Sequence, residues 1–418
     1  MAGSLIADAG LADAGRARIE WAEAQMPVLR SVRERFAAQR PLAGVRVAVC
    51  LHVTAETANL VGALRAGGGE VALCAANPLS TQDEVAAALA GDEVEVHAVR
   101  GEDLAAYARH VAAVAAGEPQ ITVDDGADLI TALHAGEPAR RERLIGGTEE
   151  TTTGLLRVRA LEAQERLACP VLAVNESQIE RAFNDRHGTG QSALDGIVRA
   201  TGLLLAGQTL VLLGYGATGQ GIAQRARGAG AAVVVCEVDP LRALAARMDG
   251  FEVMTALAAA ERGDVFVTVT GSRDVLRAEH FERMRDGAVL ANAGHFDVEI
   301  DLSGLRALAG DEGREVLPLV RQFDVAGRKL NLLAAGRVVN LAAGDGHAAA
   351  VMDLSFASQA LAVEHLVEHA GTLEARVLPV PREVDEAIAT LKLAALGVTI
   401  DALTAEQQRY LTSWNQRA

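Results

Sequence analysis

Short apolar runs alternate with segments of helical period along the first part of the chain. The runs consist mostly of Val, Leu, Ile and Ala, and apolar residues recur every three or four positions in the segments between them. This alternation predicts parallel strands joined by helical crossovers. Ser80 and Asp83 are expected to form a capping box that opens the helix after the second strand. The strands are expected at residues 45–53, 70–77, 94–100 and 121–125.

A second series of the same kind follows and carries a glycine-rich turn of its own. Together the two series predict an α/β protein with two doubly wound parallel-sheet domains, residues 1–178 and 190–346. A hinge is expected near 176–190. The segment 347–380 is expected to return to the first domain, and 381–418 to form a short C-terminal extension. The strands of the second domain are expected at residues 209–216, 231–239, 264–271, 288–294 and 337–344.

Composition and charge narrow the class of ligand. The 418 residues carry a formal charge of −16, which argues against nucleic acid because phosphate binding needs a basic surface. No apolar run reaches membrane-spanning length, and no signal peptide is recognisable at the first residues. The four cysteines are scattered without zinc-ligand spacing, so neither disulfides nor a metal are expected. The sequence therefore predicts a cytoplasmic protein whose ligand is a small molecule.

The glycine-rich turn predicts a dinucleotide site. Gly214, Gly216 and Gly219 follow an apolar strand and precede a helix, so backbone amides and the helix dipole can meet a pyrophosphate. Glu237 ends the next strand, where a carboxylate accepts hydrogen bonds from the adenosine ribose and repels a 2′-phosphate. NAD is therefore favoured over NADP, although the nearby Arg242 weakens that exclusion. The alternative is an ordinary glycine turn with a surface glutamate.

Several longer runs resemble one enzyme family. CLHVTAETANL, NPLSTQDEVAAA, VDDGADL, EETTTG, VNES, NAGHFDVEID and GDGHAAAVM occur in order from near Cys50, and together they are similar to S-adenosylhomocysteine hydrolases. The resemblance implies a substrate domain for a nucleoside, a Rossmann domain that holds NAD, and closure around the substrate. It also implies transient oxidation at the ribose 3′ carbon, which acidifies the 4′ hydrogen so that the 5′ group can be eliminated. Water or a thiol then adds, and the ketone is reduced again.

The resemblance assigns roles to individual residues. His52 and Asp125 match the pair that moves protons at the 5′ position, although a lone strand-end histidine is more often a core residue and paired aspartates can cap a helix. Glu150 matches a residue bonded to the sugar hydroxyls, and His295 one that approaches the nicotinamide. The substrate-binding residues are expected to be Thr54, Glu56, His347 and Met352. Besides the glycines and Glu237, the expected cofactor-binding residues are Thr151, Thr152, Thr153, Asp185 and Asn340. Without the resemblance, EETTTG would be interpreted as a helix N-terminus, His295 as a loop residue and Asn340 as part of a turn.

The chain departs from the family beside the sugar. The family's lysine, which helps to take the 3′ hydroxyl proton, falls at Glu180, and its aspartate falls at Asn184. Replacing a buried cation by a carboxylate reverses the local field. Glu180 or Asp185 could serve as the base, or Arg181 could take the place of the lysine. Neighbouring differences place His187 and Thr189 where the family has tyrosine and cysteine. The chain also ends at SWNQRA, without the family's tail to a neighbouring subunit's NAD, so looser cofactor retention is expected.

Three functions follow from these observations. The first is an NAD-dependent lyase, a dehydratase that eliminates water from an adenine nucleoside in nucleoside-antibiotic biosynthesis. The second is ordinary S-adenosylhomocysteine hydrolysis, supported by the length of the match and opposed by Glu180 and Asn184. The third is a catalytically silent, NAD-bound regulatory subunit. A homotetramer or homodimer is expected from the family alone.

Overall fold

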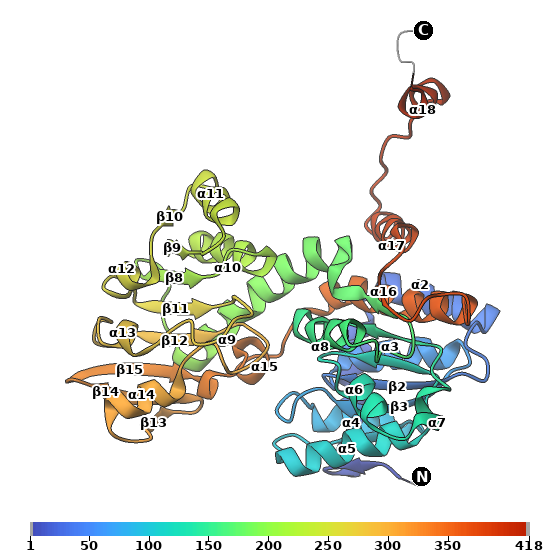
Figure 1. Cartoon of the computed structure of the whole chain (residues 1–418), viewed down its shortest axis with the longest axis horizontal. Coiled ribbons are helices and arrows are strands. Elements are labelled where there is room, and N and C mark those ends of the chain that lie inside the picture. Colours follow the sequence, from blue (N-terminus) through green and yellow to red (C-terminus); the bar gives the residue numbers. More distant parts are fainter. Residues whose placement is uncertain (1–2, 415–418) are drawn as a thin grey trace.

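The computed structural model describes residues 3–414, and two sheets of parallel strands organise them (Figure 1). The first sheet has the order β1-β4-β3-β2-β5-β6-β7-β16, and all its pairs are parallel. Its strands are β1 (Leu5–Ile6), β2 (Arg46–Leu51), β3 (Glu70–Ala75), β4 (Glu95–Ala98), β5 (Ile121–Asp124), β6 (Gly146–Glu149), β7 (Val171–Ala173) and β16 (Val377–Pro379).

Helices cover both faces of this sheet because its strands are apolar on both sides. Buried Ala, Val and Leu side chains from α2, α3 and α16 form the main core with β2 and β3. The helices are η1 (Ala9–Leu11), α1 (Ala12–Glu23), α2 (Pro27–Gln39), α3 (Ala55–Ala66), α4 (Asp83–Gly91), α5 (Leu104–Ala116), α6 (Asp128–Ala135), α7 (Pro138–Arg141), α8 (Thr152–Ala163), η2 (Val174–Glu176) and α16 (Ala349–Glu368).

The second sheet has the order β10-β9-β8-β11-β12-β15-β14-β13 and ends in an antiparallel hairpin. Its strands are β8 (Thr209–Leu213), β9 (Ala232–Cys236), β10 (Glu252–Val253), β11 (Val265–Thr268), β12 (Val289–Asn292), β13 (Arg314–Leu317), β14 (Val320–Val325) and β15 (Arg328–Leu333). The predicted α/β class with a Rossmann domain is confirmed. Its helical segments are η3 (Glu180–Thr189), α9 (Gly190–Thr201), α10 (Ala217–Gly228), α11 (Pro240–Met248), α12 (Ala256–Ala260), α13 (Ala278–Phe281), α14 (Leu302–Ala309), η4 (Ala334–Gly336) and α15 (Val339–Ala342).

Both sheets reverse their strand order at a point that matters for ligand binding. In the first sheet the reversal lies between β2 and β5, and in the second between β8 and β11. Ligands of open α/β sheets bind in the crevice beyond the carboxyl ends of the strands at such a reversal. Residues that directly follow β2, β5, β8 and β11 are therefore the ones the fold offers to a ligand.

Two local predictions are wrong. Residues 337–344 form no strand: only Val338 makes an isolated bridge, and Val339–Ala342 form α15. The carbonyl of Val339 instead packs against Gly196 of α9. The contact requires glycine there, because a Cβ on Gly196 would lie 2.5 Å from the Val339 oxygen. The strand of this region is β15, and Asn340 lies on a short helix.

The predicted capping box is also absent. Helix α4 begins at Asp83 with Gln82 as its N-cap, and no side chain caps it. Ser80 cannot serve because its hydroxyl donates to the carbonyl of Asn77 at 3.0 Å and lies beside His52. The polar residue after β3 thus supports the functional cleft rather than the helix.

The C-terminal segment continues beyond the first sheet. Helix α17 (Arg382–Ala395) packs on α2 and α16, whereas α18 (Ala405–Thr412) extends away and is exposed throughout (Figure 1). Residues 1, 2 and 415–418 lie outside the described residues. The last four belong to the segment SWNQRA, where the family's tail was expected to be missing. Among the described helices, none combines the length and apolar character that a membrane span requires.

Candidate functional site

A cavity of about 600 Å³ lies where the carboxyl ends of the two sheets face each other. Its walls come from loops after β2, β5, β6, β8, β11 and β12, from η3 and from the start of α16. Gly214, Gly219 and Glu237 are not part of its lining. The cavity brings together most of the predicted site residues: His52, Thr54, Glu56, Asp125, Glu150, Thr151, Thr152, Thr153, Glu180, Asn184, Asp185, Gly216, His295, Asn340, His347 and Met352.

His52 and Asp125 form a pair at the reversal point of the first sheet. Neighbouring strands β2 and β5 end side by side, so the residues after them meet, with His52 Nε2 3.1 Å from Asp125 Oδ2. The Ser80 hydroxyl already donates to Asn77, and it therefore accepts from His52 Nδ1–H at 2.7 Å. The contact between Nε2 and Oδ2 then requires one further proton. Burial lowers the pKa of His52, and the charge of Asp125 opposes that shift.

The two adjacent aspartates divide their roles. Asp124 is buried and accepts backbone bonds from Leu129 at 2.8 Å and Ile130 at 3.1 Å, so it is the one that caps the following helix. Asp125 instead faces the cavity. The capping interpretation of this pair therefore applies to Asp124, and the catalytic interpretation of Asp125 stays a prediction.

Two further imidazoles surround Asp125. His295, from the loop after β12, places Nδ1 3.9 Å from Asp125 Oδ1 and so crosses from the second sheet to the first. His347 bonds through Nε2 to the hydroxyl of Thr189 at 2.9 Å. Burial, with repulsion from His52, lowers the pKa of His347 to about 4, so this ring is neutral at pH 7. One end of the cavity is thus rich in imidazoles around a single carboxylate.

The EETTTG segment is organised by a residue that sequence analysis did not select. Glu149 accepts bonds from the backbone of Gly126 (2.9 Å) and Thr151 (2.8 Å) and from the Thr151 hydroxyl (2.8 Å). Thr151 also caps α8 by accepting from Gly154 at 2.9 Å, so its hydroxyl is already occupied. Gly154 packs closely against the carboxyl of Glu149, because an added Cβ would lie only 2.2 Å from it. Glu150 is left to face the cavity.

Glu150 receives a hydrogen bond from Gln359 Nε2 at 3.0 Å. Burial, and then repulsion from Asp125, raises the pKa of Glu150 to about 8. On the neighbouring loop, Thr54 caps α3 with its hydroxyl, and burial raises the pKa of Glu56. Glu150 and Glu56 are therefore both held in a poorly solvated environment.

The glycine turn fits a dinucleotide. Gly214 has φ +106°, and a Cβ on Gly219 would meet the Gly214 carbonyl at 2.2 Å, so both positions require glycine. Gly216 is the N-cap of α10 and provides no side-chain cap, which leaves the first amides of the helix free for an anion. Glu237 follows β9 and accepts from the backbone of Tyr215 at 2.8 Å, so its carboxylate is fixed beside the turn. These features suit the pyrophosphate and ribose of NAD.

The next predicted cofactor residues are Asp185 and Asn340. Asp185 of η3 bonds to Thr218 in the first turn of α10, and burial raises the pKa of Asp185 to about 6. Asn340 donates to Ser192 at 3.2 Å, while its buried Oδ1 has no partner among the described residues. That free acceptor is available to a ligand amide. Thr152 bonds to Asn175, and Thr153 lines the cavity.

Of the residues of α16, sequence analysis named only Met352 and missed Ser355 and Gln359. Ser355 accepts from Asn184 at 2.6 Å and Gln359 donates to Glu150. Both side chains are fully buried. Polar residues inside an otherwise apolar, fully buried helix were the available signal, because a buried polar group needs a partner.

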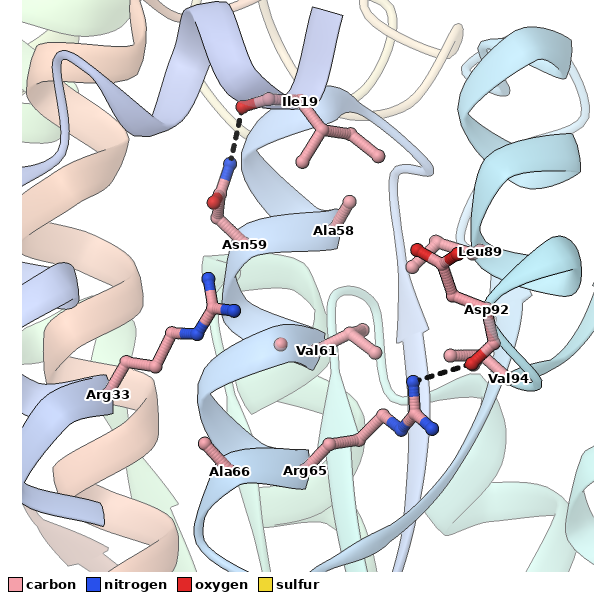
Figure 2. Close-up of a pocket in the computed structure, with 11 residues that line it drawn as sticks. Ile19, Arg33, Ala58, Asn59, Val61, Arg65, Ala66, Leu89, Asp92 and Val94 are labelled. Carbon is pink, nitrogen blue, oxygen red and sulfur yellow. Dashed lines mark hydrogen bonds between the residues drawn. The ribbon is translucent and has the colours of Figure 1, made fainter. Parts of the chain in front are cut away.

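A second hollow of about 410 Å³ lies between α1, α3 and α4 (Figure 2). Its polar groups are satisfied locally, since Arg65 donates to the carbonyl of Asp92 at 2.8 Å and Asn59 to that of Ile19 at 3.1 Å. It contains none of the predicted site residues, and the chemistry therefore belongs to the larger cavity.

Comparison with known proteins gives the family. Residues 4–145 match the model described as S-adenosyl-L-homocysteine hydrolase, and residues 185–346 match its NAD binding domain. An adenosylhomocysteinase of Aquifex aeolicus is 55% identical, covering 98% of each chain. An adenosylhomocysteinase of Gloeobacter violaceus is 51% identical (97% of this chain, 95% of that one), and an S-inosyl-L-homocysteine hydrolase of Methanopyrus kandleri is 51% identical (98% and 97%). The predicted family and the NAD cofactor are confirmed, and the chain belongs to the NAD-dependent S-adenosylhomocysteine hydrolase family of enzymes.

Proposed function

We propose that the protein hydrolyses the 5′ thioether of a purine nucleoside bound to homocysteine, with S-adenosylhomocysteine as the first candidate. The comparisons support this second sequence hypothesis better than the dehydratase, because full-length relatives at 55% and 51% identity are named for such hydrolases. The observation that carries the proposal is the His52–Asp125 pair, which faces the same cavity as the dinucleotide turn.

The chain's own residues suit the steps of this reaction. NAD, when bound, supplies the acceptor and later the donor of the hydride at the ribose 3′ carbon. Glu150, held by Gln359, can bind sugar hydroxyls. The free Oδ1 of Asn340 can accept a hydrogen bond from the part of the ligand that lies against the second domain. The His52–Asp125 pair holds one proton at Nε2 or Oδ2 and can give it to the leaving sulfur or take one from water. His347 and Thr189 connect the two halves of the cavity, which favours the exclusion of water.

Release of free thiol tests the proposal. The NAD-loaded protein is incubated with S-adenosylhomocysteine and, in parallel, with S-inosylhomocysteine, and homocysteine is quantified with a thiol reagent. Turnover of either substrate supports the proposal, and the faster one identifies the base. No thiol from either, under conditions in which adenosine reduces the bound cofactor, contradicts it.

A second candidate is dehydration of an adenine nucleoside, the first sequence hypothesis. The observation that favours it is the carboxyl of Glu180, buried in the cavity wall where the family resemblance implies a lysine. The same oxidation would then be followed by loss of water. Detection of a 4′,5′-alkene from adenosine, with no thiol released from either thioether, selects this reaction.

A further inference from the structure

One face of the π-helix η3 forms the wall of the cavity. Bonds from residue i to i+5 bring residues four and five apart onto the same face of such a helix. Glu180, Asn184, Asp185 and Thr189 follow that spacing, and all of them line the cavity. The wider turn thus directs two carboxyls, an amide and a hydroxyl toward one ligand.

Glu180 is the deepest of these groups. It is only 2% exposed, and its Oε1 has no hydrogen-bond partner among the described residues. Its neighbours Asn184 and Ser355 are neutral and bonded to each other at 2.6 Å. No salt bridge between described residues includes Glu180 or Glu150. A buried carboxyl without a cation therefore points at the ligand space.

No lysine is available to supply a charge or a base at this place. The sequence contains two, Lys329 and Lys392, and both are engaged elsewhere: Lys329 with Asp324, and Lys392 with Asp353 at 2.8 Å. The nearest arginine on η3, Arg181, is more than half exposed, lies 3.8 Å from Glu176, and cannot accept a proton near neutral pH. Arg181 therefore cannot act as the base, and the alternative in which it takes the lysine's place through its charge stays a prediction.

The imidazoles are placed for a different task. His52, His295 and His347 all interact with Asp125 or with one another. Glu180 instead interacts with Glu150 and Asp185, and burial together with repulsion from Glu150 raises the pKa of Glu180 well above its ordinary value. Among the other charged groups around η3, Glu176 pairs with Arg159 and Asp353 with Lys392, whereas Arg186 and Arg225 form no salt bridge among the described residues. The cavity thus has an imidazole end and a carboxyl end.

We infer that Glu180 is the catalytic base of the oxidation step, acting as one half of a carboxyl pair with Glu150 that shares a single proton. The inference rests on the proposed function and deepens it. Glu180 and Glu150 line the same cavity, neither has a cationic partner among the described residues, and in such a setting the ionisation of one carboxyl disfavours that of the other. The ionised member accepts a hydrogen bond from the sugar hydroxyl that is to be oxidised.

The step balances in atoms and charge. The C–H bond at the 3′ carbon breaks, and its two electrons leave as hydride to the nicotinamide. The O–H bond breaks, its proton goes to the carboxyl pair, and the C–O bond becomes a ketone. The pair loses its one negative charge as the nicotinamide loses its positive charge, so no uncompensated charge arises in the buried site. Reduction at the end of the cycle returns the proton.

Glu180→Gln tests the role, with Glu176→Gln as the matched control. The control makes the same change on a nearby carboxyl whose charge is already paired with Arg159. Glu180→Gln should keep its NAD and bind adenosine, yet form NADH from adenosine about 10²–10⁴-fold more slowly. The wild-type rate should rise with pH as the pair passes from two protons to one, and the variant should lack that rise. NADH formation at the wild-type rate, or with the wild-type pH profile, overturns the inference.

Binding by the unmodified protein provides a second readout. An ionised carboxyl that accepts from the 3′ hydroxyl should make the preference for adenosine over 3′-deoxyadenosine grow with pH as the pair passes from two protons to one. A preference that is constant with pH overturns the inference even if Glu180→Gln fails to fold. Failure of the proposed function has a different signature, since adenosine would then still reduce the cofactor while the thioethers release no thiol.

Discussion

The third glycine of the dinucleotide turn offers a prediction with a magnitude set by the structure. A Cβ on Gly219 would lie 2.2 Å from the carbonyl oxygen of Gly214, about 1.2 Å inside the 3.4 Å at which ordinary contacts begin. That oxygen cannot retreat easily, because the N–H of the same peptide group, that of Tyr215, is held by Glu237 Oε2 at 2.8 Å. Gly219→Ala must therefore open the turn.

Gly216→Ala is the matched control within the same turn. A Cβ there would have its nearest neighbour at 3.9 Å, an Arg242 nitrogen, so the apoprotein should tolerate it. Its methyl group would enter the space where the backbone approaches a pyrophosphate. The two variants thus separate a clash within the protein from a clash with the cofactor.

The expected magnitudes follow from overpacking, which costs about 1–3 kcal/mol. Gly219→Ala should lower the melting temperature of the apoprotein and weaken NAD binding by about 5- to 150-fold. Gly216→Ala should weaken NAD binding while the apoprotein melts as the wild type does. NAD released by heating the purified proteins is quantified, and the apoproteins are compared by calorimetry. Wild-type stability and NAD content in Gly219→Ala would refute the reasoning.

Three further predictions concern other parts of the chain. His52→Gln should slow homocysteine release about 10²–10⁴-fold in the thiol assay, yet leave NADH formation from adenosine largely intact, because His52 faces Asp125 rather than Glu180. Lys392→Met should destabilise the protein by about 3–5 kcal/mol in calorimetry, since it leaves the fully buried Asp353 unpaired, and adding Asp353→Asn should restore much of the loss. Glu150 holds a proton in the folded state up to its pKa of about 8, whereas the unfolded chain loses it near 4.5. Apoprotein stability should therefore fall between these pH values, by at most about 1.4 kcal/mol per unit, and Glu150→Gln should flatten the melting profile.

Sequence pattern predicted the strands that carry the site because those strands are buried on both faces. Strands β2, β8 and β9 are nearly continuous apolar runs, and these strands and β5 were each expected within a few residues of the observed bounds. Short strands such as β6, with the sequence GGTE, lack that signal, since glycine has low strand propensity. The apolar run at 338–341 was misinterpreted because a fully buried short helix and a strand look alike in periodicity.

The candidate site was predictable at strand ends and less so elsewhere. His52, Asp125 and the glycines follow strands at the reversal points, where topology alone directs attention. Ser355 lies 171 positions from its partner Asn184 and Gln359 lies 209 positions from its partner Glu150, so only the folded chain brings them together. The family resemblance located Glu180 at an altered position, but its lack of a cationic partner required the three-dimensional arrangement.

Exchange of the 4′ hydrogen with solvent tests the central claim most directly. Adenosine is incubated with the NAD-loaded protein in deuterium oxide, and the recovered nucleoside is analysed by mass spectrometry and NMR. Transient oxidation at the 3′ carbon predicts one deuterium at the 4′ carbon, introduced while the bound cofactor is reduced. Recovered adenosine without deuterium, from protein that contains its NAD, would contradict the account.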